Sequence, residues 1–162
     1  MRTLLILKLL TLLAVANGTP LIAKNVFRNR FSQPIDGGIK FVDGKPLFGS
    51  SKTIRGIVLS ILVTTACAPV FGLAWEQGAV VGSAAMAGDL LSSFLKRRIN
   101  LPAEGMATGL DQVPESLFPL LACRGSLSLT AVDIAVGVAV FLLCSILFSA
   151  LLYKLRLRDR PY

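Results

Sequence analysis

Long apolar stretches dominate this chain and constrain its fold more than any other feature of the sequence. The three clearest cover residues 56–75, 78–95 and 127–152, and each is close to or above the roughly 20 residues that an apolar α-helix needs to cross a bilayer. The mean hydropathy of +0.70 is also too high for an ordinary water-soluble domain. The sequence therefore predicts an all-α, polytopic integral membrane protein, with a single membrane domain over residues 1–162.

Two weaker segments bring the expected number of spans to about five. Residues 3–23 are apolar but contain Lys8 and then Asn17-Gly18-Thr19-Pro20, so we expect this helix to be broken near its end. Residues 113–123 are short and include two prolines and a glutamate, and in isolation they are typical of an interfacial or re-entrant segment. The start of the chain also has the form of a cleavable signal peptide, with a leucine-rich run before Ala14-Val15-Ala16.

Basic residues gather in three places, which predicts the topology. Seven lie in residues 24–55, three in 96–98 and four in 154–160. Because Lys and Arg are enriched in cytoplasmic loops, we expect all three clusters on the cytoplasmic side of the cell membrane. Five crossings, with 113–123 as the fourth, satisfy this with the N-terminus outside and the C-terminus inside. The cytoplasmic loops are then 24–55 and 96–112, whereas cleavage of a signal peptide would export the first of them.

The residue inventory excludes several chemistries. The chain has no histidine, which rules out Ser-His-Asp and Cys-His catalysis and every metal site with a histidine ligand. Its three cysteines lie in apolar stretches without CxxC spacing, so we expect them to be small buried hydrophobic residues.

Polar residues at the end of the third span form one line. At 3.6 residues per turn, one helix face carries a carboxylate, two hydroxyls and an ammonium, contributed by Asp89, Ser92, Ser93 and Lys96. Asp89 could bind Mg²⁺ while Lys96 and Arg97 contact phosphate oxygens. Alternatively, these basic residues anchor the helix among the headgroups and pair with Asp89.

Two further features fit phosphate chemistry. Asp111 lies where the chain re-enters the membrane, so it could share the cation with Asp89 or cap a helix. Residues 34–56 contain five glycines and four basic residues, which suit a backbone cradle for phosphates. The spacing is not that of a Walker A loop, and lipid headgroups would be an equally suitable ligand.

In combination, these residues resemble the CDP-archaeol synthase family over about residues 14–118. The matching motifs are Asn17 with Pro20, Pro34-Ile35-Asp36-Gly37-Gly38, Asp43-Gly44, Leu47-Phe48-Gly49, Lys52-Thr53, Arg55-Gly56, Gly88-Asp89-x2-Ser92-Ser93-Phe94-x-Lys96-Arg97-Arg98 and Asp111-Gln112. Ser50 stands where an acidic residue is expected in archaeal relatives. The final span matches only as an apolar helix.

The resemblance implies an Mg²⁺-dependent membrane cytidylyltransferase of phospholipid biosynthesis, with five transmembrane helices and a charged cytoplasmic cavity. Such an enzyme would convert CTP and 2,3-bis-O-geranylgeranyl-glycerol 1-phosphate to CDP-archaeol and pyrophosphate, and its partners would be these substrates and membrane lipids, not nucleic acid. The expected catalytic residues are Asp89, Lys96 and Asp111, and the expected metal ligands are Asp89 and Asp111. The expected nucleotide- and phosphate-binding residues are Asn17, Asp36, Gly37, Gly38, Lys52, Thr53, Arg55, Ser92, Ser93, Arg97, Arg98 and Gln112.

Three alternatives stay open from the sequence. The related phosphatidate cytidylyltransferases share the pattern of Ser93, Lys96, Arg97 and Asp111, but their second acidic pair is replaced here by Leu101-Pro102. A small transporter would need polar residues continuing through the spans, and few are present. A non-catalytic scaffold would explain the small residues of 78–88 but not the glycine-rich basic loop.

Overall fold

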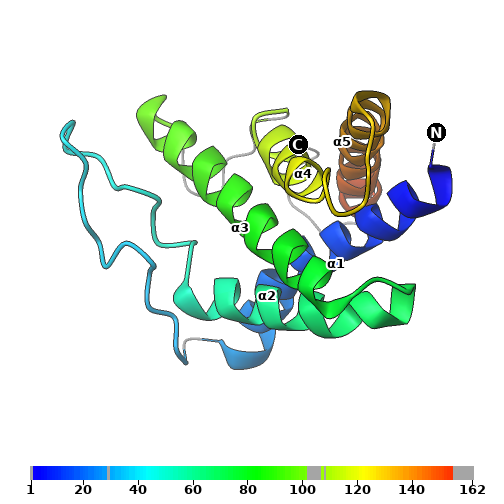
Figure 1. Ribbon diagram of the computed structural model, residues 1–162. Helices are drawn as coiled ribbons and strands as arrows, with labels where there is room; N and C mark the ends of the chain where they lie inside the picture. Colours follow the sequence, from blue (N-terminus) through cyan, green and yellow to red (C-terminus); the bar gives the residue numbers. More distant parts are fainter. Residues whose placement is uncertain (1, 29, 102–106, 108, 155–162) are drawn as a thin grey trace.

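The computed structural model describes residues 2–28, 30–101, 107 and 109–154, and these form a bundle of α-helices (Figure 1). The elements in chain order are α1 (Thr3–Phe27), α2 (Ile54–Cys67), the 3₁₀-helix η1 (Ala68–Phe71), α3 (Trp75–Arg98), α4 (Gln112–Ala122) and α5 (Ala131–Lys154). Apart from two isolated β-bridges in the first loop, this part of the chain has no β-structure. The predicted all-α fold is confirmed, whereas the basic residues of the tail, Arg156, Arg158 and Arg160, lie outside the described residues.

Among the residues that the structure describes, four helical segments are long and apolar enough to cross a membrane. They are Thr3–Phe27, Ile54–Phe71, Trp75–Arg98 and Ala131–Ser149. The fourth expected span, 113–123, forms α4, which has 11 residues and a length of about 16 Å, compared with roughly 30 Å of bilayer hydrocarbon. The structure thus shows four helices of spanning length and one short helix packed among them.

The predicted break in the first helix is wrong, because α1 continues through Pro20 to Phe27. Proline has no N–H to donate to the carbonyl four residues earlier, which is that of Ala16. The hydroxyl of Ser60, on α2, donates to this carbonyl at 2.7 Å, and both Ser60 and Ala16 are fully buried. A neighbouring helix therefore supplies the hydrogen bond that the proline removes, as is common in membrane helices.

Replacing Ser60 by alanine is expected to destabilise the protein by about 1–2 kcal/mol, because the buried Ala16 carbonyl would lose its donor. Thermal unfolding of the purified protein in detergent measures the change. The matched control is Thr11→Ala, since the exposed Thr11 hydroxyl donates only to Leu7 of its own helix. Equal melting temperatures for the two variants would contradict the bridging role of Ser60.

The connection between α2 and α3 also differs from the expected one. The predicted spans 56–75 and 78–95 leave only residues 76–77 between them, but the second helix ends in η1 and residues 72–74 make the turn. Glu76 and Gln77 lie in the first turn of α3, where the Gln77 side chain accepts a hydrogen bond from the Ala74 N–H at 3.0 Å. This side-chain cap accompanies a start of α3 three residues earlier than the apolar pattern gives.

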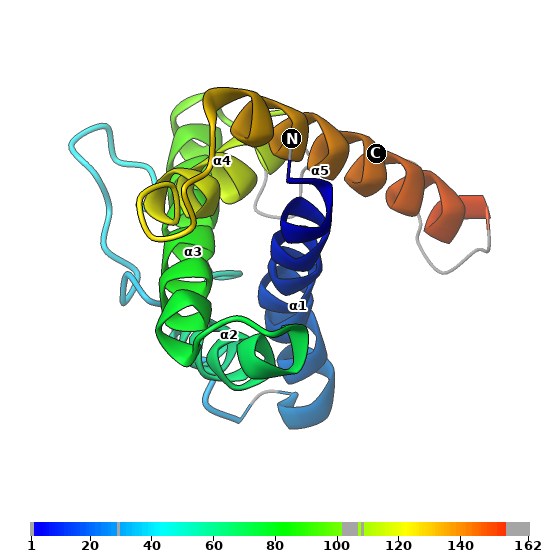
Figure 2. The same ribbon diagram turned by 45° about the vertical axis from the view of Figure 1, so that its right-hand side comes forward.

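Small residues bring α3 into close contact with its neighbours. A Cβ atom at Gly78 would lie 2.6 Å from the Ala68 Cβ, and one at Gly82 would lie 3.1 Å from the Ile61 Cα. These glycines therefore allow the neighbouring helix to approach α3 closely. The helix α3 packs against α1, α2 and α4, whereas α5 packs on α4 and α1 (Figure 2).

The core lies between these helices, and the outer faces are apolar. Buried leucines of α1 meet Val81, Ala85 and Met86 of α3. Outward positions such as Leu62 of α2 and Leu147 of α5 are exposed, as expected for helices that face lipid. The prediction that all three cysteines are buried is wrong, because only Cys123 is; Cys144 is exposed on α5, which packs on the bundle along one side only.

Candidate functional site

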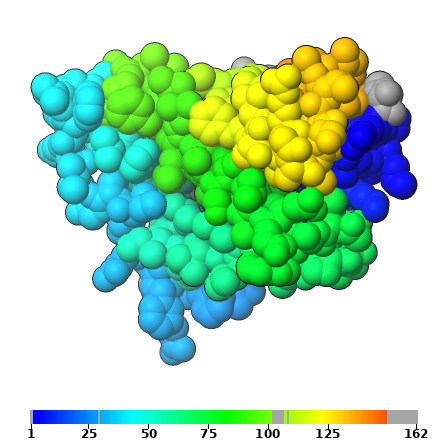
Figure 3. Space-filling model, in the orientation of Figure 1, coloured from blue at the N-terminus to red at the C-terminus, as the bar shows by residue number. Residues whose placement is uncertain are grey.

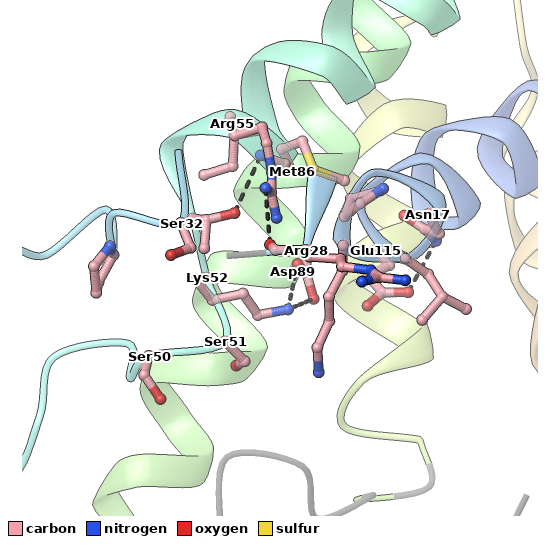
Figure 4. A pocket seen from close by; sticks show the side chains of 17 residues that line it. Asn17, Arg28, Ser32, Ser50, Ser51, Lys52, Arg55, Met86, Asp89 and Glu115 are labelled. Carbon is pink, nitrogen blue, oxygen red and sulfur yellow. Dashed lines mark hydrogen bonds and ion pairs between the residues drawn. The ribbon is translucent and has the colours of Figure 1, made fainter. Parts of the chain in front are cut away.

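A pocket of about 650 Å³ opens where α1, the first loop, α2, α3 and α4 meet (Figure 4). Its lining comprises Asn17, Pro20, Leu21, Lys24, Arg28, Ser32, Pro34, Ser50, Ser51, Lys52, Thr53, Arg55, Gly56, Ile57, Met86, Asp89 and Glu115. Five of the predicted site residues, Asn17, Lys52, Thr53, Arg55 and Asp89, are among them. Segments far apart in the sequence thus contribute to one polar cavity.

An ion pair between the first loop and α3 lies in this pocket. The Lys52 ammonium is 2.6 Å from one carboxylate oxygen of Asp89, and both side chains are about one-fifth exposed. The loop holds Lys52 in place, because its carbonyl accepts a hydrogen bond from the Ile35 N–H at 2.8 Å. Asp89 therefore faces a cation from the glycine-rich loop, as well as the open pocket.

A second carboxylate, that of Glu115 on α4, lies beside Asp89. The two side chains are close enough for their charges to interact, and the Asn17 amide donates to Glu115 at 3.0 Å. The other amide atom of Asn17, its Oδ1, is buried and has no hydrogen-bond partner among the described residues. Glu115 was not predicted as a site residue, although it lies four residues after Asp111 and so on the same helix face.

Of the two predicted metal ligands, Asp89 lines the pocket and Asp111 does not. Asp111 lies outside the pocket and pairs with the buried Lys96, with 2.8 Å between the Lys96 ammonium and the Asp111 Oδ1. This ion pair joins the end of α3 to the start of α4. Arg97 is also buried and is close enough to Asp111 for their charges to interact.

The contact between α3 and α4 uses further residues that were expected to bind nucleotide. Ser92 is fully buried, and its hydroxyl lies 2.9 Å from the carbonyls of Gly88 and Leu110. Because Pro114 has no N–H to donate to Leu110, Ser92 provides a donor there. Ser93 is also buried, and the Gln112 side chain accepts a hydrogen bond from the Gly109 N–H at 2.7 Å, which closes the turn before α4. The structure places these residues in the helix contact, not in the pocket lining.

Asp36 organises the first loop. Its carboxylate accepts hydrogen bonds of 3.0 Å from the N–H groups of Gly38, Phe48 and Gly49. Burial by itself would raise the pKa of Asp36, but these backbone hydrogen bonds together hold it below its ordinary value. Gly37 and Gly38 have φ of +55° and +83°, which glycine adopts without strain, and they form the turn beside Asp36.

Substituting Asp36 by asparagine is expected to loosen this loop, because a side-chain amide has a single oxygen and cannot accept hydrogen bonds from all three N–H groups. A buried N–H group left without an acceptor lowers the free energy of unfolding by about 1–3 kcal/mol. Hydrogen exchange at Phe48 and Gly49 should become faster. Unchanged exchange in the variant would contradict this role.

The pKa of Asp36 is lowered by folding, so its carboxylate stabilises the folded protein to an extent that depends on the pH. This contribution is complete at pH values above the ordinary pKa of an aspartate and is lost as the pH falls through the lowered pKa of the folded state.

Thr53 and Arg55 shape the start of α2 at the pocket. The Thr53 hydroxyl accepts a hydrogen bond from the Gly56 N–H at 3.2 Å and caps the helix. Arg55 donates to the Arg28 carbonyl at 3.2 Å and to that of Arg30. Lys24 and Arg28, one turn apart at the end of α1, also line the pocket; their spacing, typical of one helix face, is the signal in the sequence that marks them.

Arg98 lies apart from the pocket. It forms an ion pair with Asp43 and stacks on the rings of Phe41 and Phe94, with its guanidinium carbon 4.8 and 4.9 Å from their centroids. These contacts tie the first loop to the last turn of α3.

The charges of the pocket suit a phosphate-rich ligand. Lys24, Arg28, Lys52 and Arg55 surround two carboxylates in a cavity that also exposes serine hydroxyls, and in Figure 4 the side chains of Arg28, Lys52 and Arg55 reach into the same space. Cations and hydroxyls bind phosphate oxygens, while neighbouring carboxylates suit a divalent cation. The arrangement can therefore hold a polyphosphate together with a metal ion.

Comparison with known proteins agrees with this chemistry. A family model described as "CarS-like: CDP-archaeol synthase" matches residues 4–81. The CDP-archaeol synthase of Pyrobaculum calidifontis is 31% identical over 156 residues, covering 91% of each chain. That of Sulfurisphaera tokodaii is 32% identical over 154 residues, covering 91% of this chain and 89% of the relative.

The fold is shared with a solved structure described as that of an intramembrane enzyme for archaeal membrane lipids biosynthesis. The TM-score is 0.73 at 27% identity, over 86% of this chain and 89% of the other. By its sequence similarity to these relatives, the chain belongs to the CDP-archaeol synthase family.

Proposed function

We propose that this protein transfers the cytidylyl group of CTP to a lipid phosphate and releases pyrophosphate. The acceptor implied by the family is 2,3-bis-O-geranylgeranyl-glycerol 1-phosphate, and the product is then CDP-archaeol. The observation that carries the proposal is the pocket itself, where four basic side chains surround Asp89 and Glu115 in a helical membrane protein of this family.

The chemistry requires little from the protein beyond positioning and charge. The lipid phosphate oxygen attacks the α-phosphorus of CTP, a P–O–P bond forms, and the bond to the leaving pyrophosphate breaks. A phosphate monoester has a second pKa of about 6, so it is mostly dianionic at pH 7 and needs no general base. This agrees with a chain that contains no histidine. Lys24, Arg28, Lys52 and Arg55 would neutralise the phosphates.

The residues also fit the proposed Mg²⁺. Within the described residues no three acidic, cysteine or histidine side chains form a cluster, but Asp89 and Glu115 present adjacent carboxylates to the pocket. Mg²⁺ commonly takes one or two carboxylates and completes its shell with water and substrate phosphates. When bound, it would supply charge neutralisation at the phosphates. Asp89 and Glu115 would hold it, and the Lys96–Asp111 pair would position α4 beside them.

For the topology we propose that α4 completes the fourth crossing, so that the N-terminus lies outside and the C-terminus in the cytoplasm. In support, this arrangement keeps the three basic clusters of the sequence on one side of the membrane. The pocket then opens at the cytoplasmic headgroup level, where a soluble nucleotide and a lipid phosphate can meet. We regard the enzyme as a component of membrane phospholipid synthesis.

A direct assay tests the function. Purified protein with CTP and Mg²⁺ should release pyrophosphate only when a lipid phosphate is added, and the corresponding lipid alcohol should give none. Comparing an archaeal ether-lipid phosphate with phosphatidate identifies the acceptor class. Pyrophosphate release that does not depend on the lipid phosphate would exclude the proposed reaction.

A further inference from the structure

The first loop has an apolar tip that the catalytic proposal does not use. Residues 39–44, here called the loop tip, form a tight turn in which the Gly44 N–H donates to the Phe41 carbonyl at 2.9 Å. Val42, at the centre of the turn, is 96% exposed, and Ile39 is 64% exposed. Turn centres are usually occupied by Gly, Pro, Asn, Asp or Ser, so an exposed valine at this position is a marked departure.

Contacts with α3 determine where the loop tip lies. The Phe41 ring packs edge-on against Phe94 with 5.3 Å between centroids, and the Lys45 ammonium donates to the Arg98 carbonyl at 2.9 Å. Arg98 also pairs with Asp43. The space-filling view shows the loop beside this end of α3 (Figure 3). Since α3 is a helix of spanning length whose last turn is Lys96-Arg97-Arg98, its end marks the membrane boundary, and the tip is tied to that level.

We infer that the loop tip inserts into the headgroup region of the lipid leaflet at the C-terminal end of α3. Val42 and Ile39 would lie at the boundary of the acyl chains, and the exposed Lys40 beside them would contact lipid phosphates. Apolar side chains next to a lysine are the combination that binds an anionic membrane surface, because burial of apolar area and attraction of the charge act together.

Insertion would hold one wall of the pocket at the membrane. The chain runs from the loop tip through Phe48 and Gly49, which Asp36 fixes, to Lys52 in the pocket. A tip anchored at both the bilayer and α3 would keep this segment at headgroup depth. The inference concerns membrane contact and holds whether or not the proposed reaction is correct.

Tryptophan fluorescence tests the insertion. Trp75 is the only tryptophan, so Trp75→Phe gives a silent background in which Val42→Trp reports on the tip. In nanodiscs that contain brominated and anionic lipids, the emission of this reporter should be blue-shifted and quenched. Acrylamide, a quencher in water, should have poor access to it. Because position 42 is 96% exposed, the substitution does not disturb the interior, and Ile39→Trp provides a second reporter.

Two controls make the result decisive. Leu62→Trp, on the outward face of α2, gives the quenching of a lipid-facing site, and a free tryptophan amide in solution gives that of water. Lys40→Gln should weaken the dependence of tip quenching on anionic lipid, whereas Lys40→Arg should retain it. Absence of bromine quenching at position 42 would overturn the inference. Acrylamide quenching would then be strong if water surrounds the tip and weak if another protein covers it. Lipid dependence unchanged by Lys40→Gln would overturn the electrostatic contact.

Discussion

Replacing Asp89 by asparagine is expected to abolish turnover, with a loss of about 10²–10³-fold or more in kcat. The change removes the negative charge that faces Lys52 and Glu115 in the pocket, and with it one of the two carboxylates proposed to hold Mg²⁺. Pyrophosphate release from CTP, measured with saturating lipid phosphate, gives the size of the effect. Glu76→Gln is the matched control, because Glu76 is exposed at the opposite end of the same helix.

Companion variants distinguish the two possible pairs of metal ligands. Glu115→Gln should share the defect and raise the Mg²⁺ concentration needed for half-maximal activity, because its carboxylate lies beside that of Asp89. Asp111→Asn should leave the Mg²⁺ requirement nearer to normal, since the Asp111 carboxylate is paired with Lys96 outside the pocket. A full rate in Asp89→Asn would refute the catalytic assignment. A normal Mg²⁺ requirement in Glu115→Gln, with an altered one in Asp111→Asn, would favour the pair predicted from the sequence.

Replacing Gly88 by alanine is expected to cost about 3 kcal/mol or more of stability and to reduce activity severely. A Cβ atom there would collide with the carbonyl oxygen of Pro114 and lie 2.8 Å from the Glu115 nitrogen. These are backbone atoms, so α4 itself would have to move, and overpacking of this kind exceeds the usual range of about 1–3 kcal/mol. Asp89 directly follows Gly88 in the chain, so the movement of α4 would also separate Glu115 from Asp89.

The melting temperature in detergent and the rate of pyrophosphate release together test this prediction. Gly18→Ala is the matched control, because Gly18 lies within α1 and nothing lies within 4 Å of an added Cβ. This control should be as stable as the parent or more so, since alanine favours the helix over glycine. Equal stability of the Gly88 and Gly18 variants would show that α3 and α4 do not approach as closely as described.

Several site residues could be predicted because their signals are local. Asp89 and Lys96 share a helix face by spacing alone, and the glycine-rich loop before α2 marks Lys52, Thr53 and Arg55 as partners of phosphate. Three of these, Lys52, Thr53 and Arg55, do line the pocket with Asp89. Lys96 lies on the same helix face as Asp89 but does not line the pocket, because its ammonium group pairs with the Asp111 carboxylate at 2.8 Å.

Other residues could not be assigned from spacing because their roles depend on a second element. Ser60 hydrogen-bonds the Ala16 carbonyl across a helix contact, which keeps α1 continuous through its proline. Asp36 binds amides up to 13 residues away in the loop, although its motif resembles that of a ligand residue. Glu115 interrupts an otherwise apolar segment, and its partnership with Asp89 emerges only when α4 packs on α3.

By itself, the sequence determined that this chain forms apolar helices of spanning length joined by basic loops. In hydrocarbon, backbone N–H and carbonyl groups must be paired within the protein, and an α-helix pairs nearly all of its own, so composition and length are enough to predict the helices. Which carboxylates meet in the pocket was decided only by the tertiary structure. That outcome depends on distances between helices, and Gly88 allows the backbone of α4 to come close enough for Glu115, in place of Asp111, to reach Asp89.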